Sequence, residues 1–254
     1  MIAHLPILQV IIPLMAAPIC LMLKRTQLVW FFSIIASGLA FAVSILLLQQ
    51  VMASGVISYE LGGWQAPWGI EYRIDKLNAF LLLIISGIST VVLFAAQTSL
   101  EKEIPKDKHI YFYVLYLLSL TGMLGIVATG DAFNVFVFLE ISSLSAYALI
   151  GMGNKRQALW ASYQYLIMGT IGATFILIGI GLMYQMTGTL NMHDLSQRLP
   201  EVEQSRTVLA AFAFVIVGVC LKLAMFPLHL WLPNAYAYAP SIVTAFFAAT
   251  ATKV

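Results

Sequence analysis

The sequence VCLKLAMFP, residues 219–227, places one lysine and one proline inside an otherwise apolar run. Pro227 has no N–H and would clash with the carbonyl of Leu223, so we expect the helix to kink or break just after Lys222. Such a break at membrane depth is tolerated where the freed carbonyls line a cavity or meet water. Transporters place ion sites at these breaks. The stretch therefore predicts an ion-handling site in a broken membrane helix.

The composition is that of an integral membrane protein. Apolar residues make up 61% of the 254 residues, charged residues 9%, and the net charge is +2. A soluble domain carries about 25% charged residues. A net charge this small argues against a nucleic-acid partner. The two cysteines and four histidines lack the spacing of metal ligands, so we expect no metal, no cofactor and no catalytic residue within this chain.

Runs of about 20 apolar residues predict spanning helices. We expect an all-α polytopic fold with about eight spans, near Leu5–Leu23, Leu28–Met52, Leu77–Leu100, Ile110–Thr129, Ala132–Gly151, Ala158–Met186, Thr207–Trp231 and from Pro240 to the end. The last run reaches only about 22 Å as a helix, against about 30 Å of hydrocarbon. We therefore expect the chain to be the N-terminal part of a longer one.

The connectors between the spans predict the orientation. Odd-numbered connectors hold seven basic residues and even-numbered ones four. By the positive-inside rule the odd connectors are cytoplasmic and the N-terminus lies outside, in a bacterial inner (plasma) membrane. The connector Glu101–Lys108 alternates acid and base, which is typical of a solvated surface. Two external connectors are long enough to have their own structure: Ser54–Lys76 predicts a packed turn or hairpin, and Thr187–Arg206 is polar and mixed in charge.

Three ionisable residues, Glu140, Lys222 and Lys253, lie within the apolar runs. Each charge at mid-membrane costs roughly 2.5–3.5 kcal/mol, so such charges are usually paired, hydrated or used to move ions. If helical geometry persists past Pro227, His229 returns to nearly the same face as Lys222 and could form a second station of a proton relay. The alternatives are a purely structural role for Lys222 and an interfacial position for His229 beside Trp231.

Glu140 lies near the middle of its span, and Ser143 and Tyr147 share its helix face. An ion pair between Glu140 and Lys222 would hold the proton on the lysine, and breaking the pair would let the lysine release it. A static interhelical salt bridge is the alternative. Asp131, at the start of the same span, predicts a helix cap.

Two segments together resemble one family. They are the stretch from Leu221-Lys222 through FPLHLWLPNAY, residues 226–236, with ATKV at residues 251–254, and NVFVFLEISSL, residues 134–144. They resemble the proton-conducting antiporter-like subunits shared by respiratory complex I, such as its L, M and N subunits, and the Mrp sodium/proton antiporters. Within that family the chain most resembles the D-type subunit of the Mrp antiporter. Complex I members often read Pro-Asp-Ala-His where this chain has Pro233-Asn234-Ala235-Tyr236, which favours the antiporter type and weakens any role for a carboxylate or imidazole there.

The resemblance implies a fold of about fourteen helices built on two inverted five-helix repeats. This chain would then supply a three-helix region, residues 1–109, and the first repeat, residues 110–254, with a broken seventh helix. Glu140 would be the fifth-helix carboxylate, Lys222 the lysine of the broken helix, and Lys253 the connecting lysine of the eighth.

Three functions remain open after the sequence. The first is a subunit that conducts protons in a sodium/proton antiporter. The second is a proton-pumping membrane subunit of an NADH:quinone oxidoreductase or a hydrogenase-type complex. The third is a scaffold whose buried charges only hold helices together. Expected partners are other membrane subunits of the same complex, protons, sodium ions in the antiporter case, and the lipid bilayer.

Overall fold

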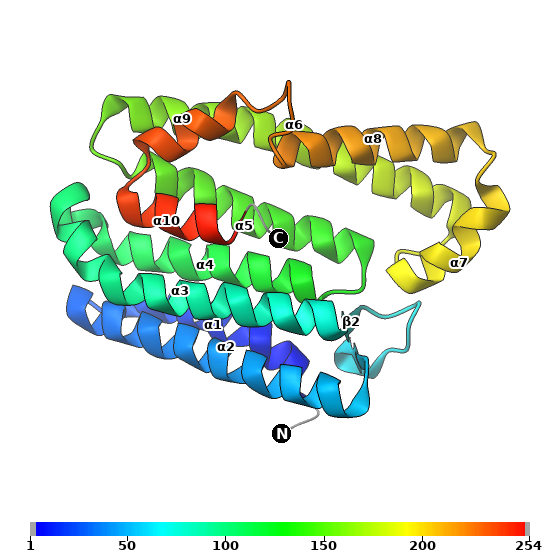
Figure 1. Cartoon of the computed structure of the whole chain (residues 1–254), viewed down its shortest axis with the longest axis horizontal. Coiled ribbons are helices and arrows are strands. Elements are labelled where there is room, and N and C mark those ends of the chain that lie inside the picture. Colours follow the sequence, from blue (N-terminus) through cyan, green and yellow to red (C-terminus); the bar gives the residue numbers. More distant parts are fainter. Residues whose placement is uncertain (1–3, 252–254) are drawn as a thin grey trace.

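A computed structural model describes residues 4–251 of the chain. Helices dominate it, with one small β-hairpin and two short 3-10 turns (Figure 1). In chain order the elements are α1 Leu5–Met22, α2 Thr26–Ser54, β1 Ile57–Glu60, η2 Leu61–Gly63, β2 Glu71–Ile74, α3 Lys76–Glu103, η3 Lys106–Lys108, α4 His109–Ala128, α5 Ala132–Gly151, α6 Arg156–Thr187, α7 Met192–Val202, α8 Arg206–Lys222, α9 Trp231–Tyr238 and α10 Ser241–Ala249.

Six helices within residues 4–251, α1 to α6, are long and apolar enough to cross a membrane. The expectation of about eight spans is corrected at the last two positions. The predicted span Thr207–Trp231 is divided into α8, which ends at Lys222, and α9, which begins at Trp231. The predicted span from Pro240 appears as the nine-residue α10, and its last three residues lie outside the described part of the chain.

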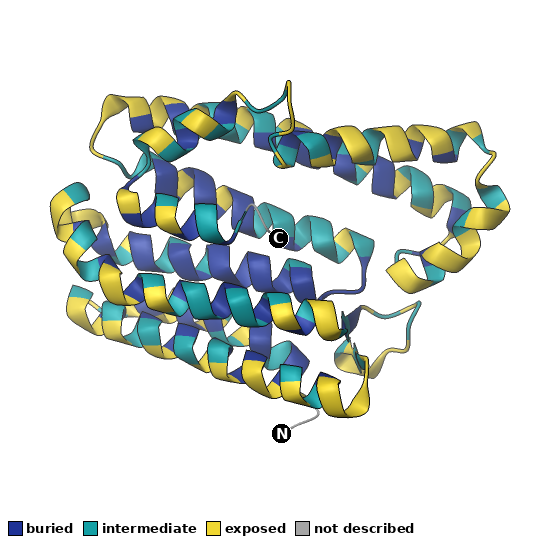
Figure 2. Cartoon of the chain, viewed as in Figure 1, coloured by how far each residue is buried: buried dark blue, intermediate teal, exposed yellow. Residues whose placement is uncertain are grey.

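Helix α4 is the centre of the bundle. It packs against α1, α3 and α5, and Figure 2 shows it as the most continuously buried of the helices. Its aromatic residues Phe112, Tyr113 and Tyr116 are fully buried, and the Tyr116 ring stacks on Phe246 of α10 at 4.1 Å. The outward faces of α1, α2 and α3 expose apolar side chains, as expected for helices that meet lipid.

Hydroxyl groups join the first three helices in the interior. The Gln9 amide donates to Ser44 Oγ at 2.8 Å, and the Ser44 and Ser86 hydroxyls lie 2.9 Å apart. Ser37 and Thr90 make the same kind of contact between α2 and α3 at 2.9 Å. Without a hydrophobic driving force in lipid, small residues and polar contacts of this kind hold helices together.

The segment Ser54–Lys76 forms the expected hairpin, with β1 antiparallel to β2 and Glu60 opposite Glu71. Glu71 is buried and ties three segments together. Its carboxylate accepts from Ser58 Oγ at 2.6 Å and from Asn191 Nδ2 at 2.8 Å, and its carbonyl accepts from Gly130 N at 2.8 Å. The hairpin therefore fastens the α4–α5 connection to the segment that precedes α7. The connector Thr187–Arg206 has its own structure, as expected, because α7 forms within it.

Asp131 caps α5 as the sequence predicts. Its Oδ1 accepts from Asn134 N at 2.7 Å. Burial raises the pKa of the Asp131 carboxyl above its usual value, against the opposing effect of the backbone hydrogen bonds from Asn134 and Phe133. The cap and the hairpin together fix where α5 begins.

Close contact between α4 and α5 depends on Gly122. A Cβ at this position would lie 2.5 Å from Ser142 N and 2.6 Å from Phe138 O, both backbone atoms. We expect Gly122→Ala to push α5 away from α4 and lower the free energy of unfolding by roughly 1–3 kcal/mol, measured by thermal unfolding in detergent. Gly38→Ala in α2 is the matched control, because nothing lies within 4 Å of its added Cβ. Equal stability of the two variants would contradict the prediction.

Candidate functional site

Helix α8 ends at Lys222, where the sequence predicts a break. The backbone then turns through residues 223–230 before α9 begins. Ala224 adopts a left-handed conformation with φ +53°, and Met225 N donates to Cys220 O at 3.0 Å in place of the next helical bond. The break places a lysine side chain at the end of a helix and inside the protein.

Lys222 of α8 lies next to Glu140 of α5, as expected from the sequence. The distance from Lys222 Nζ to Glu140 Oε1 is 3.7 Å, and their side chains are 14% and 23% exposed. Lys222 Nζ also donates to Ser143 Oγ at 2.8 Å. The lysine is therefore held by a hydroxyl hydrogen bond and by the charge of the carboxylate.

The carboxylate is less tightly held than the lysine. At 3.7 Å its contact with Lys222 is ionic and is longer than a hydrogen bond. Glu140 Oε1 is buried and has no hydrogen-bond partner among residues 4–251. A buried acceptor without a hydrogen-bond donor is energetically costly. Glu140 Oε1 is thus held by charge alone, whereas Lys222 also has its hydrogen bond to Ser143.

A cavity of about 530 Å³ lies beside the pair, between α4, α5, α6, α7 and α8. Lys222, Ser142 and Ser143 line it together with mostly apolar side chains, among them Met123 and Ile176. Its walls give the lysine a low-dielectric surrounding with a few hydroxyl groups. Such a surrounding strengthens the interaction between Lys222 and Glu140 compared with water.

The other predicted site residues are Pro227, His229 and Lys253, and the first two are not part of the contact between Lys222 and Glu140. Pro227 lies within the break, five residues after Lys222. The alignment of His229 with Lys222 applies only if the helix continues past Pro227; α8 ends at Lys222 and Ala224 has φ +53°, so this condition is not met. His229 lies against Phe226 with ring centroids 5.5 Å apart, and its Nδ1 has no hydrogen-bond partner in the described part of the chain. Lys253 lies outside the described residues.

Sequence reasoning missed the side chains that brace the break. Trp231 is buried, not interfacial. Its indole N–H donates to Leu221 O at 3.1 Å, and its ring stacks on Tyr165 of α6 at 4.1 Å. Asn234 Nδ2 donates to Gln164 Oε1 at 2.8 Å. The Trp-Leu-Pro-Asn run was the available signal, since a tryptophan after a helix break can donate to the carbonyls that the break frees.

Replacing Trp231 with phenylalanine should loosen the break. The variant keeps an aromatic ring against Tyr165 but loses the donor to Leu221 O, at a cost of about 1 kcal/mol. Amide hydrogen exchange over residues 219–225 should then be about fivefold faster. Trp160→Phe is the control, because that side chain is 59% exposed. Unchanged exchange in Trp231→Phe would mean that the indole does not hold the end of α8.

Comparison with known proteins gives consistent matches. The family model described as "NADH:quinone oxidoreductase/Mrp antiporter, TM" matches residues 129–254. The N-type subunit of the NADH-quinone oxidoreductase of Desulforudis audaxviator is 44% identical over all of this chain and 51% of its own length. The D-type subunit of the Na(+)/H(+) antiporter of Bacillus subtilis is 34% identical over 98% of this chain and 50% of its own length.

Two solved structures share the fold. A chain of the archaeal membrane-bound sulfane sulfur reductase matches with a TM-score of 0.89 and 33% identity, covering 99% of this chain and 50% of that one. A chain of the Mrp complex from Dietzia sp. DQ12-45-1b matches with a TM-score of 0.85 and 25% identity, covering 99% and 46%. This chain spans about half the length of the relatives it matches.

Proposed function

Because this chain belongs to the family of membrane subunits shared by complex I and the Mrp antiporters, we propose that it conducts protons through the bilayer by way of Glu140 and Lys222. The observation that carries the proposal is the 3.7 Å contact between these two charges, one of them at the end of a broken helix. Ionisable residues inside membrane segments are rare, face the protein interior and mark ion pathways.

Proton movement through the pair follows from its geometry. With Glu140 charged and close, Lys222 keeps its proton and the hydrogen bond to Ser143. When Glu140 takes a proton or moves away, the lysine stays in a low-dielectric site without a counter-charge and releases its proton to the next acceptor. Lys253, and His229 beyond the break, are the candidate acceptors. The proton taken up by Glu140 then passes to the neutral lysine, which restores the ion pair and leaves one proton moved through the site.

We assign this conduction to residues 110–254, with residues 1–109 as a supporting three-helix region. The N-terminus is placed outside a bacterial inner membrane on the charges of the connectors. The pathway would work within a larger assembly of membrane subunits, since the relatives named above are subunits of complexes.

Two assemblies are candidates. A sodium/proton antiporter is favoured by Asn234 and Tyr236, which depart from the pattern frequent in complex I members. A redox-driven proton pump is favoured by the 44% identity to the oxidoreductase relative, against 34% to the antiporter relative. In both, the same buried pair would carry the proton, and the energy source would lie in partner subunits.

Purification of the complex from its native membrane tests the proposal. Subunits with redox centres, together with proton uptake driven by NADH or another reductant, would support the pump. Sodium-dependent proton movement in vesicles without any reductant would support the antiporter. Assembly of the chain into a complex that moves no protons under either condition would favour the scaffold alternative and contradict the proposal.

A further inference from the structure

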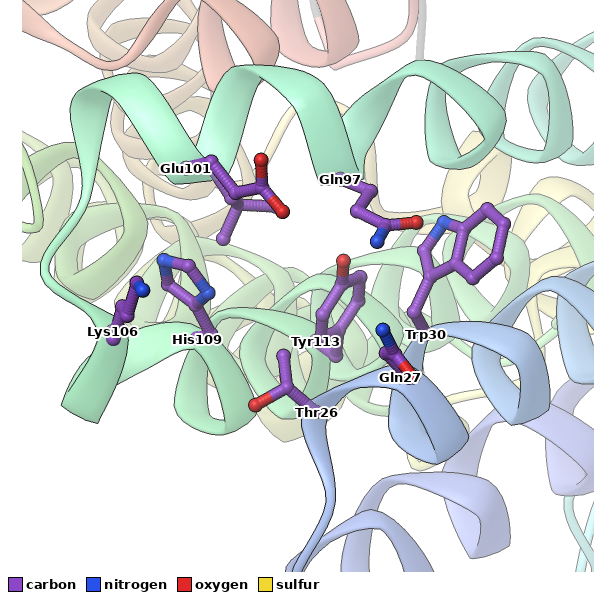
Figure 3. A pocket seen from close by; sticks show the side chains of 9 residues that line it. Thr26, Gln27, Trp30, Gln97, Glu101, Lys106, His109 and Tyr113 are labelled. Atoms are coloured by element: carbon purple, nitrogen blue, oxygen red, sulfur yellow. The ribbon is translucent and has the colours of Figure 1, made fainter.

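A second pocket, of about 170 Å³ and lined mostly by polar residues, lies at one end of the bundle. Its residues are distant in sequence from Glu140 and Lys222. It is formed where α2 begins, α3 ends and α4 begins (Figure 3). A single water needs roughly 10–15 Å³ of such space, so the pocket has room for a group of several heavy atoms. It is lined by Thr26, Gln27, Trp30, Gln97, Leu100, Glu101, Lys106, His109 and Tyr113.

The lining carries one charge of each sign. Glu101 and Lys106 both face the pocket (Figure 3). Within residues 4–251 neither makes an ion pair with another side chain. A simple anion would be repelled by Glu101 and a simple cation by Lys106. The two charges together suit a ligand that carries both a positive and a negative group.

The hydroxyl of Tyr113 is the second feature that indicates a ligand. Tyr113 is 1% exposed, and Figure 3 shows its hydroxyl directed into the pocket between Gln97 and Glu101. No hydrogen bond to this hydroxyl is present in the described part of the chain. The hydroxyl is open to the pocket while the rest of the side chain is packed in the core, so it is placed to bind a group that enters the pocket.

The backbone adds a preference for an anionic group at the α2 side. Thr26 and Gln27, the first residues of α2, line the pocket. The N-cap of α2, Arg25, makes no side-chain cap. The first backbone N–H groups of a helix point outward and attract phosphate, most strongly where no side chain occupies them.

The position of the pocket indicates where its ligand comes from. Three candidate spans, α2, α3 and α4, begin or end at its walls, and Trp30 donates its indole N–H to Leu93 O beside it. Tryptophan is enriched at the level of lipid headgroups. A group with both charges at this depth is most readily supplied by a phospholipid.

We propose that this pocket binds the phosphoethanolamine headgroup of a membrane lipid. The phosphate lies beside Lys106 and the start of α2, and the primary ammonium lies beside Glu101 and the Tyr113 hydroxyl. A choline headgroup fits poorly, because its trimethylated nitrogen has no N–H to donate to a carboxylate or hydroxyl. The site is separate from the proposed proton pathway and does not depend on it.

Native mass spectrometry of the purified chain tests the proposal. After delipidation, the chain is offered equal amounts of phosphatidylethanolamine and phosphatidylcholine. We expect about tenfold stronger retention of one phosphatidylethanolamine, from charge-assisted hydrogen bonds that choline cannot make. Soluble glycerophosphoethanolamine should not displace it at equal concentration, because it lacks the acyl chains whose burial against the apolar faces of the spans adds to the affinity of the lipid. Equal retention of the two lipids, or full displacement by the soluble headgroup, would overturn the proposal.

Matched variants connect that preference to the pocket. Tyr113→Phe removes only the hydroxyl and should reduce retention about two- to tenfold, whereas Tyr111→Phe on the exposed face of α4 should not. Lys106→Gln and Glu101→Gln should each reduce it about tenfold or more. Lys102→Gln and Asp107→Asn are their controls, since neither residue lines the pocket. Retention that follows net charge, with equal loss in variants and controls, would mean nonspecific attraction and would refute the site.

Discussion

Replacing Lys222 with methionine should reduce proton flux roughly 100-fold or more, while the protein still assembles. Methionine has a similar length and is apolar, so it fits the same surroundings but can neither hold a proton nor donate to Ser143. The flux is measured with a pH-sensitive dye in vesicles that contain the protein with its partner subunits. Assembly is followed by co-purification from the same membranes.

Lys155→Met is the control for that experiment. Lys155 is exposed just before α6 and has no ion-pair partner within residues 4–251. Its replacement removes one positive charge from the chain without touching the break. Normal flux through an assembled Lys222→Met complex would show that the buried lysine is a structural donor and that protons take another route.

Glu140 and Lys222 should act as one unit in transport. Glu140→Gln leaves a buried lysine without its counter-charge, so the lysine loses its proton and flux should fall by a factor similar to that of Lys222→Met. The double variant should be little worse than either single variant, because residues that function together are strongly non-additive. Flux from the wild type, both single variants and the double variant gives the interaction free energy directly.

Additive losses in that cycle would contradict the coupling. Each single variant must first be shown to fold, by unchanged thermal unfolding and unchanged co-purification. Ser145→Ala offers a control on the same helix, since Ser145 Oγ donates only to the backbone carbonyl of Ile141 at 2.8 Å. Its removal should leave both flux and the coupling between Glu140 and Lys222 unchanged.

The long spans can be predicted from the sequence because hydropathy and helix ends agree there. The expected span Ala132–Gly151 coincides with α5, where the Asp131 cap marks one boundary. Residue runs of this kind are constrained by the need to satisfy every backbone group in lipid, which leaves the helix as the available local structure. The hairpin between α2 and α3 can also be predicted locally, because its glycine, proline and tryptophan content is typical of a packed turn.

The region after Lys222 can be predicted only in part. Pro227 indicates a break, but it says nothing of the path the chain takes afterwards. That path depends on contacts with distant segments, such as Trp231 against Tyr165 and Asn234 against Gln164. The prediction for His229 therefore rests on a helix that tertiary contacts replace. An apolar run does not reveal whether it forms one helix or two.

The two candidate sites differ in how visible they are in a sequence. Glu140 and Lys222 are conspicuous because each is isolated in apolar surroundings. The free-energy cost of an unpaired charge in the membrane alone suggests that they form a pair. The pocket proposed to bind a lipid headgroup includes Glu101 and Lys106. Both lie in a connector that alternates acid and base, a pattern that in the sequence indicates an ordinary solvated surface. Only the positions of Tyr113 and the start of α2 show that these charges border a pocket.

A native cysteine that can be labelled with a dye lies close to the break. Cys20 is fully buried, whereas Cys220 is partly exposed two residues before Lys222, with its Sγ 3.6 Å from Met225 Sδ. Thiol reagents attack the thiolate, which forms where water reaches the sulfur. Cys220 is not among the residues that line the cavity beside Lys222, so the labelling rate of the native protein with a maleimide dye reports water access to the other face of the end of α8, without any engineered cysteine. Following that rate during turnover would show whether water access to the end of α8 changes while protons move.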